Sequence, residues 1–375
     1  MLALAVSALW PHEYVFIVDG HFDSKFLLGL GLDSWHGLVT NAAMTIFFLV
    51  VGLELSWEIR KGALRTLHSA AMPMVAAFGG MVASALTLWF LGRGLSNPSI
   101  QSGWGVPTAT DIAFTLGVLS LAGRRVPPTL RSFLLALAVA DDVLAVTLLA
   151  FISPHGVRVW WLVTGVFALA MFVTFGRRSP GAIVGSVIFV WLCLLAAHVE
   201  PALAGVFVGV LAPFGPRDAG PKLIKLITPI SSGVVLPIFA FTACGVLWHD
   251  VRWSGQLGQL LGATVVARLG GKFFGITGAM LVGRKIGLRI PAELTVGVIA
   301  SASLFCAVGF TVPLLFAGSV YGVGTSAYYS VTTGLLIGSV LAGAVGVVSL
   351  RLVLSRRKKL GKLNGEGDQH EDSAH

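Results

Sequence analysis

Two adjacent aspartates, Asp141 and Asp142, lie in the middle of an apolar stretch that runs from Phe133 to Ala150. A charged carboxylate at the centre of a bilayer costs roughly 2.5–3.5 kcal/mol on insertion scales. Two neighbouring carboxylates also repel each other, which adds to that cost. Ionisable residues in such positions mark ion pathways and proton relays. The pair therefore predicts a cation or proton site inside a membrane.

A third aspartate, Asp111, lies in the segment Pro107–Gly117, which is rich in Thr, Pro and Gly. This composition permits a membrane helix to be interrupted where the freed backbone lines a cavity. An aspartate at the interruption can offset the positive ends of two half-helices, and the free carbonyls can bind ions. The alternative is an aspartate that forms a hydrogen bond between two intact helices.

Two basic residues, Arg268 and Lys272, lie in another apolar stretch at 258–282. A lysine at that depth must pair with a carboxylate or face carbonyls, unless it snorkels from a helix end to the membrane surface. Successive helical residues point about 100° apart, so Asp141 and Asp142 cannot both face one partner. We expect one of them to pair with Lys272 and the other to coordinate an ion. Arg268 is expected to point towards an external funnel.

The composition indicates an all-α polytopic membrane protein. The 375 residues are 55% hydrophobic and 11% charged, with a mean hydropathy of +0.86, whereas soluble domains carry about 25% charged residues. The three cysteines lie in apolar stretches, so no disulfide framework is expected. The sequence contains no nucleotide-binding loop motif and no soluble domain, which argues against ATP-driven transport.

The net charge of +9 comes from basic residues that fall in every second loop. This alternation is the positive-inside pattern, so it predicts a cytoplasmic C-terminus and no nucleic-acid partner. The basic loops contain Arg60, Lys61 and Arg65; Arg124, Arg125 and Arg131; Arg177 and Arg178; Arg217, Lys222 and Lys225; Arg284, Lys285 and Arg289; and the tail from Arg351 to Lys362.

Eleven apolar stretches are candidates to cross a bilayer core of about 30 Å. They lie at 37–55, 70–92, 107–122, 129–152, 158–175, 181–198, 201–215, 230–248, 258–282, 293–318 and 328–354. Residues 1–10 are apolar but too short to cross, and we interpret them as the second half of a first helix. The total is then about twelve transmembrane helices, the first one incomplete, with residues 11–34 as an external loop. We expect one transporter domain at 1–355 and a cytoplasmic, disordered tail at 356–375.

Six runs of the sequence carry a resemblance to a known family: Ile46–Glu54, Ala109–Phe114, Ala136–Asp142, Leu236–Phe241, Gly271–Gly275 and Val308–Thr311. In this order and at compatible spacing, they resemble the NhaA-type sodium/proton antiporters. The resemblance extends over roughly 37–320 and implies the architecture of that family, in which inverted repeats contain two discontinuous, crossing helices. These helices would be the stretches near 107–122 and 293–318.

The resemblance also implies roles for individual residues. Asp142 resembles the main ligand of the transported Na⁺, Asp141 the partner of the lysine, and Thr110 a neighbouring ligand on the unwound segment. Asp111 resembles the aspartate that faces the N-termini of the half-helices. Lys272 resembles the charge-compensating lysine that faces their opposite ends.

The function that the resemblance implies is secondary transport, not enzymatic catalysis. Such a protein exchanges cytoplasmic Na⁺ or Li⁺ for external H⁺ across a bacterial inner membrane, with two H⁺ for each Na⁺, and serves sodium and pH homeostasis. No cofactor is implied. The implied partners are membrane lipid, the transported cations and protons, and a second copy of the chain in a homodimer.

Glu54 and Glu58 are expected at a cytoplasmic entrance that responds to pH, but the sequence departs from the family around them. The departures are Trp57 where an arginine is common, Ile224, Lys225 and Thr228 in place of a Glu- and His-rich pattern, and Glu200 in place of a histidine. Together with the short first helix, they motivate an alternative function, a transport-impaired homologue with a regulatory role.

A second alternative is an intramembrane aspartyl protease, which also needs two aspartates in lipid. A proteolytic dyad requires carboxylates that share a proton and converge from separate elements. Adjacent Asp141 and Asp142 diverge, and Lys272 would have no role in such a dyad.

Overall fold

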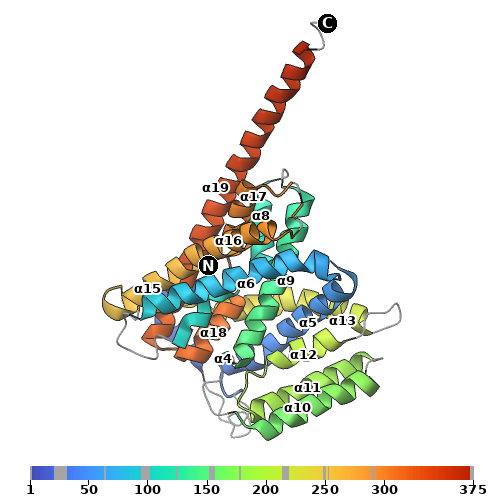
Figure 1. The fold of residues 1–375 in the computed structure, drawn as a ribbon. Helices are drawn as coiled ribbons and strands as arrows, with labels where there is room; N and C mark the ends of the chain where they lie inside the picture. The colour runs from blue at the N-terminus through green and yellow to red at the C-terminus, as the bar shows by residue number, and fades with distance from the viewer. Residues whose placement is uncertain are drawn as a thin grey trace.

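The computed structural model describes residues 2–20, 32–62, 65–93, 102–123, 126–151, 157–176, 179–212, 219–247, 251, 253–288, 290–291 and 293–371. At 2, 19, 67–69, 113, 150–151, 175–176, 219 and 357–371 it describes the backbone alone. Every regular element within these ranges is a helix (Figure 1). This result agrees with the predicted all-α class.

The first half of the described chain contains a series of helices, several of them joined without a break. They are α1 (Leu2–Leu9), α2 (Pro11–Asp19), α4 (Trp35–Gly37), η1 (Leu38–Ala43), α5 (Met44–Lys61), α6 (Leu67–Gly92), η2 (Ser102–Thr108), α8 (Ile112–Leu121), α9 (Pro128–Phe151), α10 (Val159–Met171) and η3 (Phe172–Gly176). α4, η1 and α5 form one continuous run, and so do α10 and η3.

The second half continues the same pattern. Its helices are α11 (Pro180–Ala196), α12 (Leu203–Leu211), α13 (Ala219–Ile230), η4 (Ser231–Val235), α14 (Leu236–Ala243), α15 (Gly255–Val266), η5 (Ala267–Gly271), α16 (Lys272–Lys285), α17 (Val296–Phe305), α18 (Thr311–Tyr321) and α19 (Ser326–Glu371). α19 continues beyond 355, where we expect the transporter domain to end, and that division of the chain stays a prediction.

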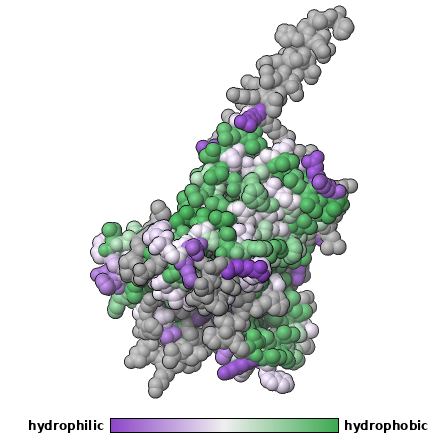
Figure 2. Space-filling model, turned by 60° about the vertical axis from the view of Figure 1, so that its left-hand side comes forward, coloured by the Kyte–Doolittle hydropathy of each residue, from purple (hydrophilic) through white to green (hydrophobic). Residues whose placement is uncertain are grey.

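Six helical runs of the described residues are long and apolar enough to cross a membrane. They are Trp35–Lys61, Ala70–Gly92, Pro128–Leu149, Gly220–Ala243, Gly255–Lys285 and Ser326–Arg356. Their outward faces carry exposed large apolar side chains such as Phe78 and Phe274, and Figure 2 shows hydrophobic residues over much of one face. Such a surface suits lipid rather than water.

Two stretches differ from the sequence-based expectation. Residues 11–19, expected within an external loop, form α2, which starts with Pro11 at its first turn, a position that favours proline. The Tyr14 hydroxyl donates to the carbonyl of Phe241 at 2.7 Å and holds α2 against α14. The span expected from 230 begins instead at Ala219. The sequence-based expectation misses this start, because the lysines of α13 lower the mean hydropathy of a segment that still forms a helix.

Two helices of the described part of the chain are interrupted, and their interruptions contact each other. The chain is non-helical between η2 and α8 and between α17 and α18. The backbone N–H of Asp111, in the first interruption, donates to the carbonyl of Val308, in the second, at 3.1 Å. The segments near 107–122 and 293–318 are therefore broken where the sequence predicts, and each break supplies part of the other's hydrogen bonding.

Glycines permit two pairs of helices to pack backbone against backbone. A Cβ on Gly52 of α5 would lie 2.6 Å from the carbonyl oxygen of Val206 in α12, and a Cβ on Gly205 would overlap the carbonyl of Thr45. A Cβ on Gly271 would lie 2.5 Å from a backbone atom of α6. Small residues have this role in membrane helix packing. The contact of Gly271 with α6 fixes the position of the neighbouring Lys272 along the axis of α6.

Part of the predicted charge pattern lies outside the described residues. This part comprises Arg124, Arg125, Arg177, Arg178, Arg217 and Arg289 of the basic loops, and residues 21–31 of the expected external loop.

We expect Gly205→Ala to destabilise the protein, because the added methyl group must push α5 and α12 apart. Overpacking of this kind costs about 1–3 kcal/mol. Thermal unfolding of the detergent-purified protein should show a lower midpoint. Gly185→Ala in α11 is the matched control, since a Cβ there meets no atom within 4 Å. Equal midpoints for the two variants would contradict the close approach of α5 and α12.

Candidate functional site

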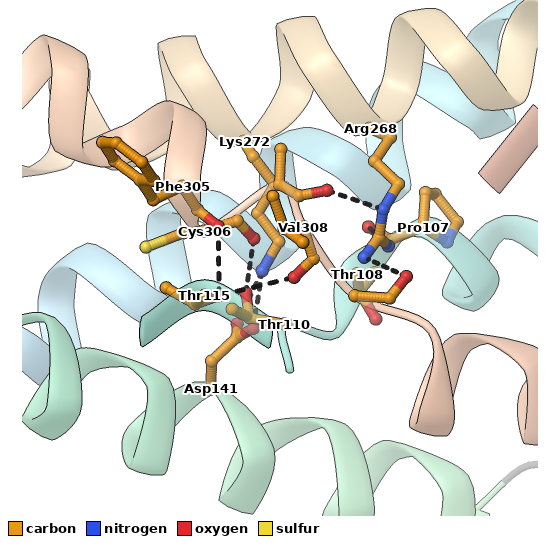
Figure 3. Close-up of polar contacts among 12 residues, drawn as sticks. Pro107, Thr108, Thr110, Thr115, Asp141, Arg268, Lys272, Phe305, Cys306 and Val308 are labelled. Atoms are coloured by element: carbon orange, nitrogen blue, oxygen red, sulfur yellow. Dashed lines mark hydrogen bonds and ion pairs between the residues drawn. The ribbon is translucent and has the colours of Figure 1, made fainter. Parts of the chain in front are cut away.

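Lys272 and Asp141 form an ion pair in the interior of the protein. The ammonium Nζ of Lys272 lies 2.8 Å from Oδ1 and 2.7 Å from Oδ2 of Asp141, and the side chains are 0% and 1% exposed (Figure 3). The pair joins α16 to α9. Both oxygens of Asp141 are thereby engaged by one ammonium group, which is the partnership that the sequence leads us to expect.

Asp142 follows Asp141 in α9 and has a different environment. Its residue is 5% exposed, and its Oδ1 atom is buried without a hydrogen-bond partner among the described residues. Its charged neighbours are Asp141, Asp111, Lys272 and Glu54. A buried carboxylate oxygen with no donor requires a partner, and a cation or a proton on the carboxyl group would supply one.

Asp111 lies at the start of two helices. Its Oδ2 accepts a hydrogen bond from the hydroxyl of Thr311, the first residue of α18, at 2.9 Å, and its Oδ1 accepts a longer one, 3.4 Å, from the N–H of Phe114 in α8. The N-terminal ends of helices carry partial positive charge. The carboxylate of Asp111 therefore compensates the positive ends of α8 and α18. We call Asp111, Asp141 and Asp142 the carboxylate cluster.

Threonines of the first interruption and of α8 form side-chain hydrogen bonds to the end of α17. The Thr110 hydroxyl donates to the carbonyl of Cys306 at 2.6 Å, and the Thr115 hydroxyl donates to the carbonyl of Phe305 at 3.1 Å. Both acceptors lie at the C-terminal end of α17, where carbonyls lose their helical donors. Thr110 itself is fully buried beside Asp111. Its hydroxyl oxygen retains lone pairs that can accept from a proton donor or bind a cation.

Arg268 is a residue of this site that the sequence reasoning misplaced. The expectation that it points towards an external funnel is wrong, because the side chain is fully buried. Its guanidinium donates to the carbonyls of Ala307 and Gly309, each at 2.9 Å, and of Pro107 at 3.3 Å (Figure 3). Backbone carbonyls leave no trace in the side-chain pattern of a sequence, so only the density of Pro, Thr and Gly at 107–117 could have pointed to them.

The comparison with known protein families identifies the protein class. The sequence model of the family described as Na⁺/H⁺ antiporter 1 matches residues 1–350. The chain belongs to the Na⁺/H⁺ antiporter 1 family. The resemblance predicted from the six sequence runs is therefore confirmed.

Individual relatives in this antiporter family match most of the chain. The Na⁺/H⁺ antiporter NhaA of Proteus mirabilis is 36% identical over 332 residues, which are 86% of this chain and 84% of the relative. The NhaA protein of Aeromonas salmonicida is 35% identical over 85% of this chain and 82% of the relative. The NhaA protein of Haemophilus influenzae is 32% identical over 87% of this chain and 83% of the relative. These relatives are named as antiporters, which are secondary transporters and not enzymes.

The two glutamates that we expect at the cytoplasmic entrance of this antiporter lie in the second half of α5. Glu58 is buried at 8% exposure, and Glu54 is partly buried and acts electrostatically on Asp142. α13, which contains the departures at 224–228, packs against α5. Trp57, between the two glutamates, is exposed. Their role in the response of this antiporter to pH stays a prediction.

Glu200 does not belong with these two glutamates. It lines a cavity of about 210 Å³ together with His36 and Asn41, which lie at the beginning of the run that contains α5. Glu58 lies seventeen residues beyond Asn41, about 25 Å along a helix. The grouping of Glu200 with the entrance residues is therefore wrong, because the family pattern gives a position in the sequence but not the end of the helix bundle.

The ion pair yields a stability prediction. We expect Lys272→Met to lower the free energy of unfolding by about 3–5 kcal/mol, because Asp141 would be left charged and unpaired in the interior. Thermal unfolding in detergent measures the loss.

The double variant Lys272→Met with Asp141→Asn should recover much of that stability, because it leaves no unpaired charge. A single variant as stable as the wild type would contradict the buried pair, and so would equal losses in the single and double variants.

Proposed function

We propose that this protein exchanges Na⁺ (or Li⁺) for H⁺ at the carboxylate cluster. The observation that carries the proposal is Asp142, whose buried Oδ1 lacks a partner beside the Lys272–Asp141 ion pair. Membership of the antiporter family supports it. The same carboxylate oxygen can receive either a metal cation or a proton, so that loading one expels the other.

In this proposal the three carboxylates have separate tasks. Asp142 is the main ion ligand, and Thr110 and backbone carbonyls of the interruptions complete an oxygen environment of the kind that Na⁺ requires. Asp141 engages Lys272, and Asp111 compensates the helix ends.

The exchange is electrogenic in our proposal, with two H⁺ entering for each Na⁺ that leaves. One net positive charge then moves inward in each cycle. A membrane potential of about 100 mV, negative inside, adds roughly 2.3 kcal/mol per cycle to sodium extrusion. Such coupling enables the cell to remove Na⁺ against a concentration gradient.

The architecture that serves this function consists of about twelve membrane helices in inverted repeats, with the two interrupted helices crossing near the midplane. Access to the cluster alternates as one bundle moves against the other around the fixed site. The positive-inside pattern supports a cytoplasmic C-terminus in a bacterial inner membrane, and Glu54 and Glu58 then lie towards the cytoplasm. A homodimer belongs to the same proposal.

The alternatives have less support. In a proteolytic dyad two carboxylates share a proton, whereas both oxygens of Asp141 contact Lys272. A transport-impaired homologue should lack part of the cluster or its contacts, but Asp111, Asp142 and the ion pair are all in place.

We expect Asp142→Asn to abolish exchange in everted membrane vesicles, because an amide can neither bind nor release a proton in this pH range. The measurement is the collapse of a respiratory pH gradient on addition of Na⁺, followed with a pH-sensitive fluorescent amine. Glu13→Gln, a charge-removing change at an exposed position of α2, is the control and should behave like the wild type. Normal activity of Asp142→Asn would refute the assignment.

The electrogenic step has its own test in proteoliposomes. An inside-negative K⁺ diffusion potential set with valinomycin should accelerate Na⁺ efflux driven by external H⁺, because each cycle moves charge inward. Equal efflux rates at zero and at negative potential would exclude the proposed 2:1 stoichiometry while leaving exchange itself intact.

A further inference from the structure

Arg268 forms a buried contact with backbone from both interrupted helices, and none of the roles considered so far accounts for it. Its three acceptors come from two parts of the chain. Pro107 belongs to the last turn of η2, whereas Ala307 and Gly309 follow the end of α17. The guanidinium therefore bridges the carbonyl ends of two half-helices that are about 200 residues apart in sequence.

The position of Arg268 is the electrostatic counterpart of that of Asp111. Helix C-termini carry partial negative charge and N-termini partial positive charge. Asp111 lies at the N-terminal ends of α8 and α18, and Arg268 lies at the C-terminal ends of η2 and α17. Each interruption thus has a carboxylate on one side and a guanidinium on the other.

The packing around the guanidinium leaves little freedom. A Cβ on Gly309 would overlap Nη2 of Arg268. The Ser339 hydroxyl of α19 also donates to the carbonyl of Gly309, at 3.2 Å. Arg268 itself lies in η5, a π-helical turn directly before Lys272, and such turns are frequent at functional sites. The backbone of the second interruption is therefore held from two sides.

The two basic residues of this region have different partners. Lys272 contacts the titratable group Asp141, whereas the three hydrogen bonds of Arg268 described above all go to neutral carbonyls. Arginine remains protonated throughout the physiological pH range. Its charge is therefore constant while ions and protons exchange at the cluster, and Asp111 and Asp141 lie within its electrostatic reach.

We propose that Arg268 is a positioning residue of the transport site, which fixes the two unwound segments against each other and supplies a permanent positive charge to the carboxylate cluster. The inference rests on the proposed function. By holding Pro107 and Gly309 together, Arg268 sets the positions of Thr110 and Asp111, which follow Pro107 in the first interruption. Its charge favours ionised carboxylates, so Na⁺ can compete with protons at lower pH.

The charged and titratable groups around the cluster come from several elements. They are Asp141 and Asp142 on α9, Asp111 before α8, Lys272 at the start of α16, Cys306 after α17, Glu54 on α5 and Arg268 in η5. Of these groups, only Arg268 is changed by the substitutions Arg268→Lys and Arg268→Gln, so a shift of the pH profile of transport reports the charge of Arg268.

Two substitutions separate geometry from charge. Arg268→Lys keeps the charge, but a single ammonium group lacks the planar fork that reaches three carbonyls. We expect it to raise the KM for Na⁺ roughly tenfold, as for a loss of about 1.4 kcal/mol in binding, and to leave the midpoint of the pH profile unchanged. Arg268→Gln should raise the KM similarly and also move the midpoint about 0.5–1 pH unit to the alkaline side, because protons then compete better.

The measurement is the Na⁺-dependent recovery of fluorescence of a pH-sensitive amine in everted vesicles, over a range of Na⁺ concentrations and pH values. Arg93→Lys is the matched control, because Arg93 stacks on Trp89 at the end of α6, away from the cluster. Gly309→Ala is a further variant. Its Cβ would overlap Nη2 of Arg268 and would lie 3.1 Å from the carbonyl oxygen of Ala109 and from the backbone nitrogen of Asp111. It therefore disturbs the packing of the two interruptions around the guanidinium without removing the charge, and should resemble Arg268→Lys. It preserves the test of geometry if the Arg268 variants do not reach the membrane.

Several results would overturn the inference. A wild-type KM and pH midpoint in Arg268→Gln would exclude both parts of the role. Loss of thermal stability alone, with unchanged KM and midpoint, would indicate a merely structural residue. A wild-type KM in Arg268→Lys or Gly309→Ala would refute the geometric part. An inactive wild-type protein would instead refute the proposed function, which makes the two failures distinguishable.

Discussion

The ion pair of Lys272 and Asp141 permits three carboxylates to occupy one buried region of this protein. A buried pair contributes little net stability, because the loss of hydration offsets the attraction between its members. The protein nevertheless places Asp142 next to the pair, with a buried oxygen that has no hydrogen-bond donor among the described residues. This arrangement is costly for stability alone, which supports the proposal that the cluster exchanges ions.

The interrupted helices supply the remaining compensation without further charged side chains. Each break exposes N–H groups on one side and carbonyls on the other, and each side receives a group of the opposite charge. Asp111 lies at the N–H side and Arg268 at the carbonyl side. Close glycine-mediated contacts, such as that of Gly271 with α6, hold the helix that carries both basic residues. The site is therefore a property of several helices together.

Much of this arrangement could be predicted from the sequence, because charges in apolar stretches have few explanations. Asp141, Asp142, Asp111 and Lys272 stand out in this way. The divergence of adjacent helical residues predicts that one of the two neighbouring aspartates pairs with Lys272, and only the family resemblance implies that it is Asp141. The partners of Arg268 could not be found, since they are backbone carbonyls brought together only by the fold. The beginning of α13 was also missed, because a hydropathy pattern does not detect amphipathic helix turns. The location of Glu200 was missed because the order of residues in the sequence does not show at which end of the helix bundle a residue lies.

The most direct test of the account is the affinity of the purified protein for Na⁺ as a function of pH, measured by titration calorimetry in detergent. If Na⁺ and protons occupy the same carboxylates, the apparent Kd must rise as the pH falls. Below the pH at which the cluster takes up protons, the rise should be about tenfold per pH unit for each proton displaced. A Kd that stays constant across that range would contradict a shared site.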